Sequence, residues 1–504
     1  MQNLCNLFIS TKMVNRYENS SIQMTKNVSR KKNRSTLKHL LLDLHVFYNL
    51  LIIKTSDIRL NTQESSKVVE TLDKEISKER RRGYTMGMTI SEKILARASG
   101  ALETHAGDIV WAKVDNAMMD DILGPRVEIA EKMEELGAKI WDPSKVTVIS
   151  DHYTPPANAK QAEIVKFTRE WSAAHGVEHY YEFAGPCHQV MVEKGRVAPG
   201  MVVVGTDSHT CAYGALGAFA TGVGSTEMLG VVSTGEIWLK VPETIKVQFD
   251  GALRRGVMAK DVILKAIGEI GHNGATYKAL GFCGTTFQNM IMDERLCVTN
   301  MAVEAGAKNG IIPCDEITLA YLRSIGADTG IAYADDEDAV YCAAYRFDAS
   351  LLEPQCACPH EVDNVCRVLD AGDVKIHQAY IGSCTGGRYN DLKAAAEMLA
   401  GKKIAKGIRL LVSPASKEIW ERCARDGILS VLAEAGATVL ASTCGACLGV
   451  HSGAIGAREV CVSSTNRNFI GRMGSKQGDV YLASPLTVAA SALTGKLTDP
   501  REFL

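Results

Sequence analysis

The chain has 504 residues, 46% of them hydrophobic, which is enough for several domains with large cores. Its fifteen cysteines show no close, even spacing, so thiols of a reducing compartment, the cytoplasm, are expected rather than a disulfide framework. The net charge of −2 is unevenly distributed: residues 1–85 hold 16 Lys and Arg against 8 Asp and Glu, and residues 86–504 hold 40 Lys and Arg against 50 Asp and Glu. The net charge of −10 on residues 86–504 does not suit nucleic-acid binding.

Residues 1–85 form a basic N-terminal extension. Their apolar stretch, residues 40–53, is short and contains polar residues such as Asp43, so neither a membrane span nor a secretory signal is predicted. A basic arm that binds an acidic surface is one interpretation. We expect instead that the extension is dispensable or mis-assigned, with the true start at Met86 or Met88.

Two apolar runs, residues 146–150 and 201–205, predict strands of a parallel α/β sheet. Each run is followed by an aspartate and a histidine, at the strand end where such sheets bind ligands. An aspartate beside a histidine fixes its tautomer and stabilises the imidazolium, which suits proton transfer. A purely structural role is the alternative, because Asp and Ser also cap helices. The candidate residues are Asp151, His152, Asp207, Ser208 and His209.

The middle of the chain gives weaker signals. A helix is predicted over residues 225–238, a break at 241–243, a strand over 245–251 and a second break near 359–370. The run Cys356-Ala357-Cys358-Pro359-His360 looks like a metal motif, but we place it in a surface connection and expect no ligation there. The predicted division is into three α/β domains, at residues 86–240, 241–370 and 371–504.

Three cysteines in the last third follow apolar runs. Cys384 follows residues 379–383, and Cys444 and Cys447 follow residues 438–443. Three thiolates can hold a cubane iron–sulfur cluster and leave one iron open to bind a substrate hydroxyl. Spacing alone also allows a zinc site or a redox dithiol. The fourth ligands available to zinc are His451, Cys423 and Cys461.

An arginine-containing loop, residues 466–472, follows the apolar run 460–462. Arg467 and Arg472 can converge on a carboxylate through bidentate hydrogen bonds. A solvated loop without a ligand is equally consistent with these residues.

Together these segments resemble the aconitase superfamily of iron–sulfur hydro-lyases, and most closely the large subunits of its 3-isopropylmalate dehydratase and homoaconitase group. The resemblance covers residues 86–504, and its motifs occur in the family's order. They are Ser150-Asp151-His152, Gly185-Pro186-Cys187-His188-Gln189, Gly205 to Thr210, Asn300 to Glu304, Gly382 to Thr385, Cys444 to Cys447 and Asn466 to Arg472.

The resemblance implies three α/β/α domains of the aconitase type, with the active site at their junction. It implies one [4Fe-4S] cluster per chain, held by Cys384, Cys444 and Cys447, with one iron that lacks a protein ligand. Asn300 and Asn466 would form hydrogen bonds around this cluster. The residues that would handle the departing hydroxyl and order water are Asp151, His152, His188, Asp207, Ser208, His209 and Glu304, and those that would bind a substrate carboxylate are Arg467 and Arg472.

Dehydration next to a carboxylate needs a base for a weakly acidic C–H and help for a poor leaving group. In the family the base is a serine on a fourth, swivelling domain, for which no matching segment follows the arginine-containing loop. We therefore expect a small subunit that brings this domain, and a heterodimer that acts on 3-isopropylmalate in leucine biosynthesis. Alternatives are a homoaconitase, a 2,3-dimethylmalate dehydratase, an RNA-binding regulator or an electron-transfer protein. No nucleic-acid or membrane partner is expected.

Two positions depart from the family's usual pattern. Gly386 stands where an asparagine is common after Cys384-Thr385, and Gly281 stands where a glutamate is common. The first is close to an implied cluster ligand and loosens the substrate assignment. The second lies outside the motifs and carries less weight.

Overall fold

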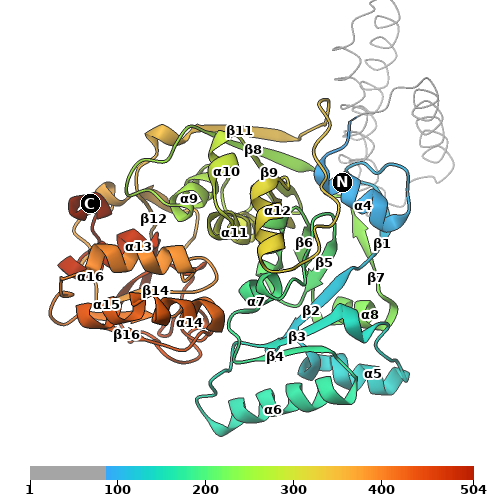
Figure 1. Cartoon of the computed structure of the whole chain (residues 1–504), viewed down its shortest axis with the longest axis horizontal. Helices are drawn as coiled ribbons and strands as arrows, with labels where there is room; N and C mark the ends of the chain where they lie inside the picture. Colours follow the sequence, from blue (N-terminus) through green and yellow to red (C-terminus); the bar gives the residue numbers. More distant parts are fainter. Residues whose placement is uncertain (1–86) are drawn as a thin grey trace, which may run out of the picture. The chain divides into compact units, whose positions relative to one another are not determined.

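The computed structural model describes residues 87–504, which belong to one compact unit (Figure 1). The basic extension and the expected start at Met86 lie outside the described residues. Across residues 87–504, no helix is long and apolar enough to cross a membrane. Mainly parallel sheets covered by helices confirm the predicted α/β class.

The first sheet has five parallel strands in the order β4-β3-β2-β5-β6. Its central strands are buried on both faces, as is usual in parallel sheets. Val146 and Val148 pack into one hydrophobic cluster and Ile149 into another, because side chains alternate along a strand. The elements are β2 (Asn116–Asp120), β3 (Val146–Ser150), β4 (His179–Glu182), β5 (Val202–Gly205), β6 (Phe219–Gly222), α4 (Ile90–Ser99), α5 (Ala130–Leu136), α6 (Ala159–Ala174), α7 (Cys187–Glu193) and α8 (Ser225–Thr234).

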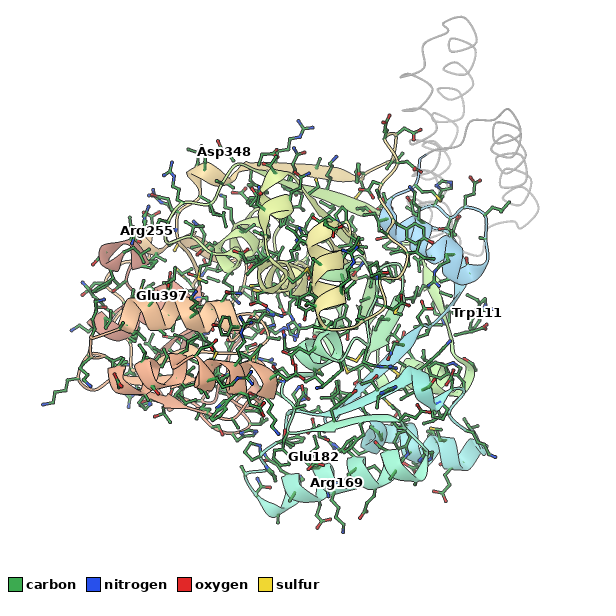
Figure 2. All side chains as sticks on the ribbon, viewed as in Figure 1. Trp111, Arg169, Glu182, Arg255, Asp348 and Glu397 are labelled. Carbon is green, nitrogen blue, oxygen red and sulfur yellow. The ribbon has the colours of Figure 1, made fainter. Side chains whose placement is uncertain are left out.

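An ion pair joins α6 to the edge strand β4. Arg169 Nε and Nη2 each donate to one Glu182 oxygen at 2.7 Å, and Figure 2 shows both side chains at the surface. Tyr180 OH donates to the same carboxylate at 2.8 Å. The bidentate geometry holds the helix against the edge of the sheet.

The helix predicted over residues 225–238 is wrong in its last four residues, 235–238. Helix α8 ends at Thr234, because Gly235 adopts a left-handed φ of 74° that glycine tolerates best. Residues Glu236–Lys240 form β7, which pairs antiparallel with β1 (Ile109–Lys113). Exposed and buried residues alternate along β7, which is the period of a strand.

The second sheet has four parallel strands in the order β10-β9-β8-β11. Strand β8, Thr244–Asp250, confirms the strand predicted over residues 245–251. Phe249 of β8 stacks on Phe347, its register partner in β11, with ring centroids 4.4 Å apart. The other elements are β9 (Ala279–Cys283), β10 (Asn309–Ile311), β11 (Ala343–Asp348), α9 (Ala259–Ile270), α10 (Thr285–Asn289), α11 (Met292–Asn300) and α12 (Glu316–Ser324).

The third sheet has seven strands in the order β13-β12-β18-β17-β14-β15-β16, with helices beside it in orange in Figure 1. Only β12 runs against the direction of the other strands, since it pairs antiparallel with both β13 and β18. Cys356 lies in β12 and is fully buried, so its predicted place in a surface connection is wrong. The elements are β12 (Gln355–Ala357), β13 (Val365–Arg367), β14 (Gln378–Ile381), β15 (Arg409–Val412), β16 (Ala437–Val439), β17 (Val460–Ser463), β18 (Asp479–Ala483), α13 (Tyr389–Leu399), α14 (Lys417–Arg425), α15 (Ile428–Ala435) and α16 (Pro485–Thr494).

The three larger sheets take their strands from successive parts of the chain. The ranges are residues 116–222, 244–348 and 355–483, and β12 pairs with β18, a strand that follows residue 370. The domain boundaries proposed at 240 and 370 stay a prediction. Most candidate site residues lie in the segments after β3, β5, β14, β16 and β17, whereas His188 lies in α7, Asn300 ends α11 and Glu304 follows α11.

Candidate functional site

The acid–base residues lie where parallel strands of the first sheet end. Asp151 and His152 follow β3 directly, and Asp207 lies two residues beyond the end of β5. Strand β2 lies between β3 and β5 and contributes Asp120 and Asp121 at its own end. These two aspartates were missed because no histidine follows them in the sequence. Adjacent parallel strands bring all these carboxylates to one edge.

His152 is enclosed by carboxylates. Its Nδ1 lies 2.7 Å from Asp151 Oδ1 and 3.2 Å from Asp121 Oδ1, and its Nε2 lies 3.9 Å from Asp207 Oδ2. Burial works to lower the pKa of His152, but the charge on Asp151 and the hydrogen bond to Asp121 raise it well above its ordinary value. His152 is therefore held as an imidazolium at neutral pH.

Asp207 is shared by two further histidines. Its Oδ1 lies 3.0 Å from His188 Nε2 and 3.2 Å from His209 Nδ1. Burial opposes its charge, but His188 and His209 lower the pKa of Asp207 well below its usual value. Because an ionised carboxylate only accepts, both histidine nitrogens carry hydrogens. His188 Nδ1 is buried without a hydrogen-bond partner among the described residues.

Glu304 connects the histidines to the arginine-containing loop. His209 Nε2 lies 2.8 Å from Glu304 Oε1, and Arg467 Nε lies 2.8 and 3.0 Å from the two Glu304 oxygens. Arg467 Nη2 donates to Ser208 Oγ at 3.0 Å. Burial opposes the charge on Glu304, whereas Arg467 and His209 lower its pKa. The loop is thus fixed to the acid–base residues rather than solvated.

The three candidate cluster cysteines lie beyond β14 and β16. Cys384 and Cys447 are buried, and Cys444 is partly exposed. Ser383 adopts a left-handed φ of 70°, a strained conformation for a residue other than glycine. Its Oγ lies 3.7 Å from Cys384 Sγ and 3.9 Å from Cys447 Sγ. The hydroxyl therefore touches two of the three sulfurs.

Two asparagine amides surround the sulfur of Cys384. Asn300 Nδ2 lies 3.3 Å from Cys384 Sγ and Asn466 Nδ2 lies 3.7 Å from it. Asn466 Nδ2 also donates to Asn300 Oδ1, and its own Oδ1 lies 3.7 Å from Cys447 Sγ. N–H groups directed at a buried sulfur stabilise a thiolate, the form that binds metal.

Asp151 joins the thiols to the acid–base residues. Its Oδ2 accepts from the backbone N–H of Cys187 at 2.7 Å and lies 3.6 Å from Cys444 Sγ. Its carbonyl oxygen accepts from the backbone N–H of Cys444 at 3.1 Å. The two groups of residues are therefore parts of one site.

The fourth ligands that a zinc site would need are engaged elsewhere. His451 Nε2 lies 3.0 Å from the carbonyl oxygen of His152. Cys423 is buried in α14 and Cys461 in β17. In the part of the chain that the structure describes, the groups of three donors close enough for one ion do not include Cys384, Cys444 and Cys447 together. The three cysteines are therefore not arranged as the ligands of a single zinc ion.

Lys260 is a buried cation that the sequence analysis missed. Its Nζ donates at 2.9 Å to Thr385 Oγ1 and to the Thr465 carbonyl, next in sequence to Cys384 and Asn466. Burial lowers the pKa of Lys260. The only signal was a lysine inside the apolar run of residues 257–264. Lys260 supplies positive charge behind the thiols.

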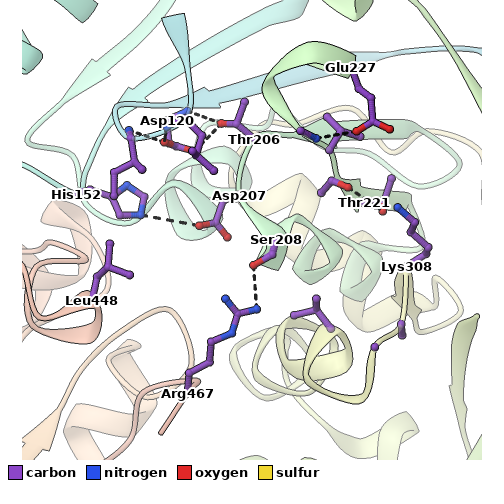
Figure 3. A pocket seen from close by; sticks show the side chains of 18 of the residues that line it. Asp120, His152, Thr206, Asp207, Ser208, Thr221, Glu227, Lys308, Leu448 and Arg467 are labelled. Carbon is purple, nitrogen blue, oxygen red and sulfur yellow. Dashed lines mark hydrogen bonds and ion pairs between the residues drawn. The ribbon is translucent and has the colours of Figure 1, made fainter. Parts of the chain in front are cut away.

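A pocket of about 570 Å³ opens over these residues (Figure 3). His152, the neighbours Asp207 and Ser208, and Arg467 face it from three different segments of the chain. Its lining includes the carboxyl side chains of Asp120, Asp207 and Glu227 and the basic side chains of His152, Lys308, Arg467 and Arg472. Mixed charges of this kind suit a small polar ligand that carries carboxylates and a hydroxyl.

Arg472 lies on the cysteine side of the pocket. Its Nη2 is 3.9 Å from Cys447 Sγ, and its Nε is buried without a hydrogen-bond partner among residues 87–504. A buried guanidinium N–H without a hydrogen-bond partner destabilises the fold. Such an unpaired donor is expected where a bound ligand supplies the missing acceptor. The structure thus brings every predicted site residue into one connected region.

Gly386 allows a close approach of Ser464. A Cβ at position 386 would lie 2.3 Å from Ser464 Oγ, closer than real contacts allow. Ser464 Oγ accepts from the backbone N–H of Gly382 at 2.9 Å, in the turn that leads to Cys384. Glycine at position 386, where the family commonly has asparagine, therefore leaves the space that Ser464 occupies. Gly281 lies in β9 and is not one of the residues that line the pocket.

Comparisons with known proteins agree with this geometry. The family described as "Aconitase family (aconitate hydratase)" matches residues 92–495. The chain is 50% identical over 421 residues to the "3-isopropylmalate dehydratase large subunit 1" of Methanopyrus kandleri, covering 83% of this chain and 100% of that protein. Two Methanothermobacter thermautotrophicus proteins are also similar: a "Probable 3-isopropylmalate dehydratase large subunit", 46% identical over 82% of this chain and 99% of that one, and a "Probable methanogen homoaconitase large subunit", 45% identical over 82% and 98%.

Among solved structures, Thermococcus kodakaraensis aconitase X in its holo-form is a weak likeness, with a TM-score of 0.43 and 12% identity over 75% of this chain and 88% of that chain. The family match and the large-subunit relatives cover nearly all of residues 87–504. They confirm the aconitase-type α/β fold expected from the motifs, and with it an iron–sulfur hydro-lyase. This chain belongs to the aconitase family.

Proposed function

We propose that this chain is the large, catalytic subunit of a hydro-lyase that interconverts 3-isopropylmalate and 2-isopropylmalate by dehydration and rehydration, a step of leucine biosynthesis. Two large-subunit relatives named for 3-isopropylmalate dehydratase, at 50% and 46% identity, support this substrate. The observation that carries the proposal is Asp151, which contacts both the proton-donating His152 and the thiol of Cys444. The carboxylate of Asp151 thus contacts both a proposed metal ligand and a proposed acid–base residue.

The residues proposed to hold a [4Fe-4S] cluster are Cys384, Cys444 and Cys447. When bound, a cluster with one iron free of protein ligands supplies a Lewis acid for the substrate hydroxyl. Asn300 and Asn466 direct their amides at the sulfur of Cys384. These hydrogen bonds, with the cation of Lys260 behind them, offset the charge of buried thiolates.

The chain's own residues supply the acid in the reaction. His152, an imidazolium that lines the pocket, donates the proton at Nε2 to the departing hydroxyl, which leaves as water. Asp151 and Asp121 hold its Nδ1 and so fix the direction of the transfer. His188 Nδ1, which has no hydrogen-bond partner among the described residues, orders the water that is released or returned.

Arg467 and Arg472 bind the substrate carboxylates. Arg467 is oriented by Glu304 and Ser208, and the buried Nε of Arg472 has no partner in the described part of the chain. A planar guanidinium matches a carboxylate with two hydrogen bonds. Lys308, also in the pocket lining, adds positive charge for a dicarboxylic acid.

The proposed partner is a small subunit that carries the swivelling fourth domain and the serine base. The relatives' names, which specify a large subunit, support a second chain. The side group of the substrate would be recognised largely by that subunit. A homoaconitate-type substrate is the second candidate, because one relative is named for homoaconitase.

The test combines the anaerobically reconstituted chain with the small subunit from the same organism. We expect the pair to isomerise 3-isopropylmalate and the chain alone to be nearly inactive, with a loaded cluster in both. Activity only on homoaconitate would transfer the assignment to the second candidate. Full activity of the chain alone would place the base within these 504 residues and contradict the two-subunit proposal.

A further inference from the structure

A second group of cysteines lies in the hairpin formed by β12 and β13. Cys356 and Cys358 are two residues apart on one extended stretch, so their side chains lie on the same face. Cys366 is the register partner of Cys356 in β13. The backbone N–H of Cys358 donates to the Asn364 carbonyl at 2.8 Å and continues the ladder beyond β12. Strand geometry alone therefore brings the three thiols together.

The sulfurs are spaced as ligands of one ion. Cys366 Sγ lies 3.6 Å from Cys356 Sγ and 3.6 Å from Cys358 Sγ, and all three sulfurs lie within 4.8 Å of one another. Two thiolates on a tetrahedral zinc ion are about 3.8 Å apart, given zinc–sulfur bonds of about 2.3 Å. The cluster cysteines Cys384, Cys444 and Cys447 do not form such a close group.

The group is closed on one side and open on the other. Cys356 is fully buried, whereas Cys358 and Cys366 are partly exposed, and all three are free thiols. The histidine of the sequence motif, His360, is not part of the close group, and its Nε2 faces Asp479 at 3.6 Å. An ion could enter from the open side and keep one position for water or a small anion.

We propose that Cys356, Cys358 and Cys366 bind one thiophilic metal ion of the zinc class, separate from the catalytic cluster. Three soft thiolates select zinc or a similar ion, and binding releases one proton from each thiol to solvent. The sequence analysis rejected this site because it placed residues 356–360 in a surface connection, and the sequence alone does not show that Cys366 lies opposite Cys356.

The ion would hold the hairpin that supports the arginine-containing loop. Asn468 Nδ2 lies 2.8 Å from the Cys358 carbonyl and 3.2 Å from the Glu361 carbonyl. Asn468 follows Arg467, so the hairpin backbone anchors the loop that reaches the pocket. A metal ion that closes the hairpin stabilises this anchor.

The test measures bound zinc in the full chain with Cys384→Ser, Cys444→Ser and Cys447→Ser combined, so that zinc cannot occupy those thiols. We expect about one zinc per chain in this background. Cys366→Ser and Cys358→Ser, both at partly exposed positions, should each remove most of it. Cys342→Ser, the same change at an exposed cysteine outside the group, should leave the zinc content unchanged. Cobalt substitution should give thiolate-to-metal absorption bands that Cys366→Ser removes.

Two results would overturn the proposal. The first is zinc content that is negligible, or that is unaffected by Cys366→Ser and Cys358→Ser. The second is a disulfide that joins Cys366 to Cys356 or Cys358 in the anaerobically isolated chain, found by mass spectrometry of peptides, because it would make the group a redox pair. Neither outcome depends on enzymatic activity, so the proposed function and this site fail separately.

Discussion

At the scale of single residues, Asp151 connects the two chemical parts of the site. Its side chain holds the Nδ1 of His152 at 2.7 Å and the backbone N–H of Cys187 at 2.7 Å, while its carbonyl holds the backbone of Cys444. A change at Asp151 would therefore disturb proton transfer and thiol placement together. Residues with a single function separate the two effects better, and Arg467 and Lys260 are such residues.

Arg467→Lys tests the substrate carboxylate site. A lysine ammonium cannot reproduce the guanidinium contacts to both Glu304 oxygens and to Ser208, so it cannot present a fixed pair of donors to substrate. We expect the KM to rise about 10- to 100-fold, the value of a lost bidentate interaction, with unchanged iron content. Steady-state kinetics with the small subunit measure this. The matched control is Arg255→Lys at an exposed position, and an Arg467→Lys enzyme with an unchanged KM would contradict the assignment.

Lys260→Met tests the buried cation behind the thiols. Methionine keeps most of the side-chain volume but removes the hydrogen bonds to Thr385 and to the Thr465 carbonyl. We expect most of the iron to be lost and the free energy of unfolding to fall by about 1–3 kcal/mol. Iron analysis and denaturant unfolding measure these effects. Lys265→Met, in the same helix but paired with Glu269 at the surface, should change neither. Full iron content in Lys260→Met would contradict the role.

At the scale of elements, the segments that follow parallel strands carry the site, and helix ends join neighbouring layers. Glu193, the last residue of α7, accepts from Ser416 Oγ at 2.7 Å and from Gln189 Nε2 at 3.0 Å. Ser416 is the N-cap of α14. This contact links the first and third sheets through one carboxyl, and burial raises the pKa of Glu193 from 4.5 to about 7.

Glu193→Gln tests this contact through pH. Because the folded chain binds the Glu193 proton more tightly than the unfolded chain, stability is greatest below pH 4.5 and is lost as pH rises toward 7. Glutamine keeps an acceptor without the charge. At about pH 8 the free energy of unfolding of Glu193→Gln should exceed that of the native sequence by up to about 2 kcal/mol. A shift of one pKa unit is worth about 1.4 kcal/mol, and the partial exposure of Glu193 reduces the effect of the whole shift. Denaturant titrations should show this difference in the free energy of unfolding shrinking toward zero near about pH 5. Glu397→Gln, at an exposed site, should show no such dependence of stability on pH. A stability difference between Glu193→Gln and the native sequence that stays the same at every pH would contradict the raised pKa of Glu193.

The periodicity of apolar residues predicted many of these strands and helices. It failed where contacts between distant parts of the chain determine the secondary structure. Apolar runs correctly placed β3, β5, β8 and β14. The helix over residues 225–238 was overextended, because a helical pattern and the alternation of β7 overlap around Gly235. Cys356 was misplaced because a three-residue strand such as β12 is too short to show a period.

At the scale of the whole molecule, the site draws on all three larger sheets. Asp151 follows a strand of the first sheet, Glu304 comes after α11 beside the second, and Arg467 follows β17 of the third. No local pattern predicts that residues so distant in sequence meet, and the family resemblance supplied that expectation. Asp121, Lys260 and Cys366 had no motif of their own and became visible only through their contacts.

The central claim is a cluster held by three cysteines, and its most direct measurement is iron and acid-labile sulfide per anaerobically reconstituted chain. The account predicts about four of each in the native sequence, with about one iron lost in air and a three-iron signal in electron paramagnetic resonance. Cys384→Ser, Cys444→Ser and Cys447→Ser should each abolish the cluster, whereas Cys461→Ser should retain it. Full iron and sulfide in all three variants, or zinc in place of iron at these cysteines, would contradict the account.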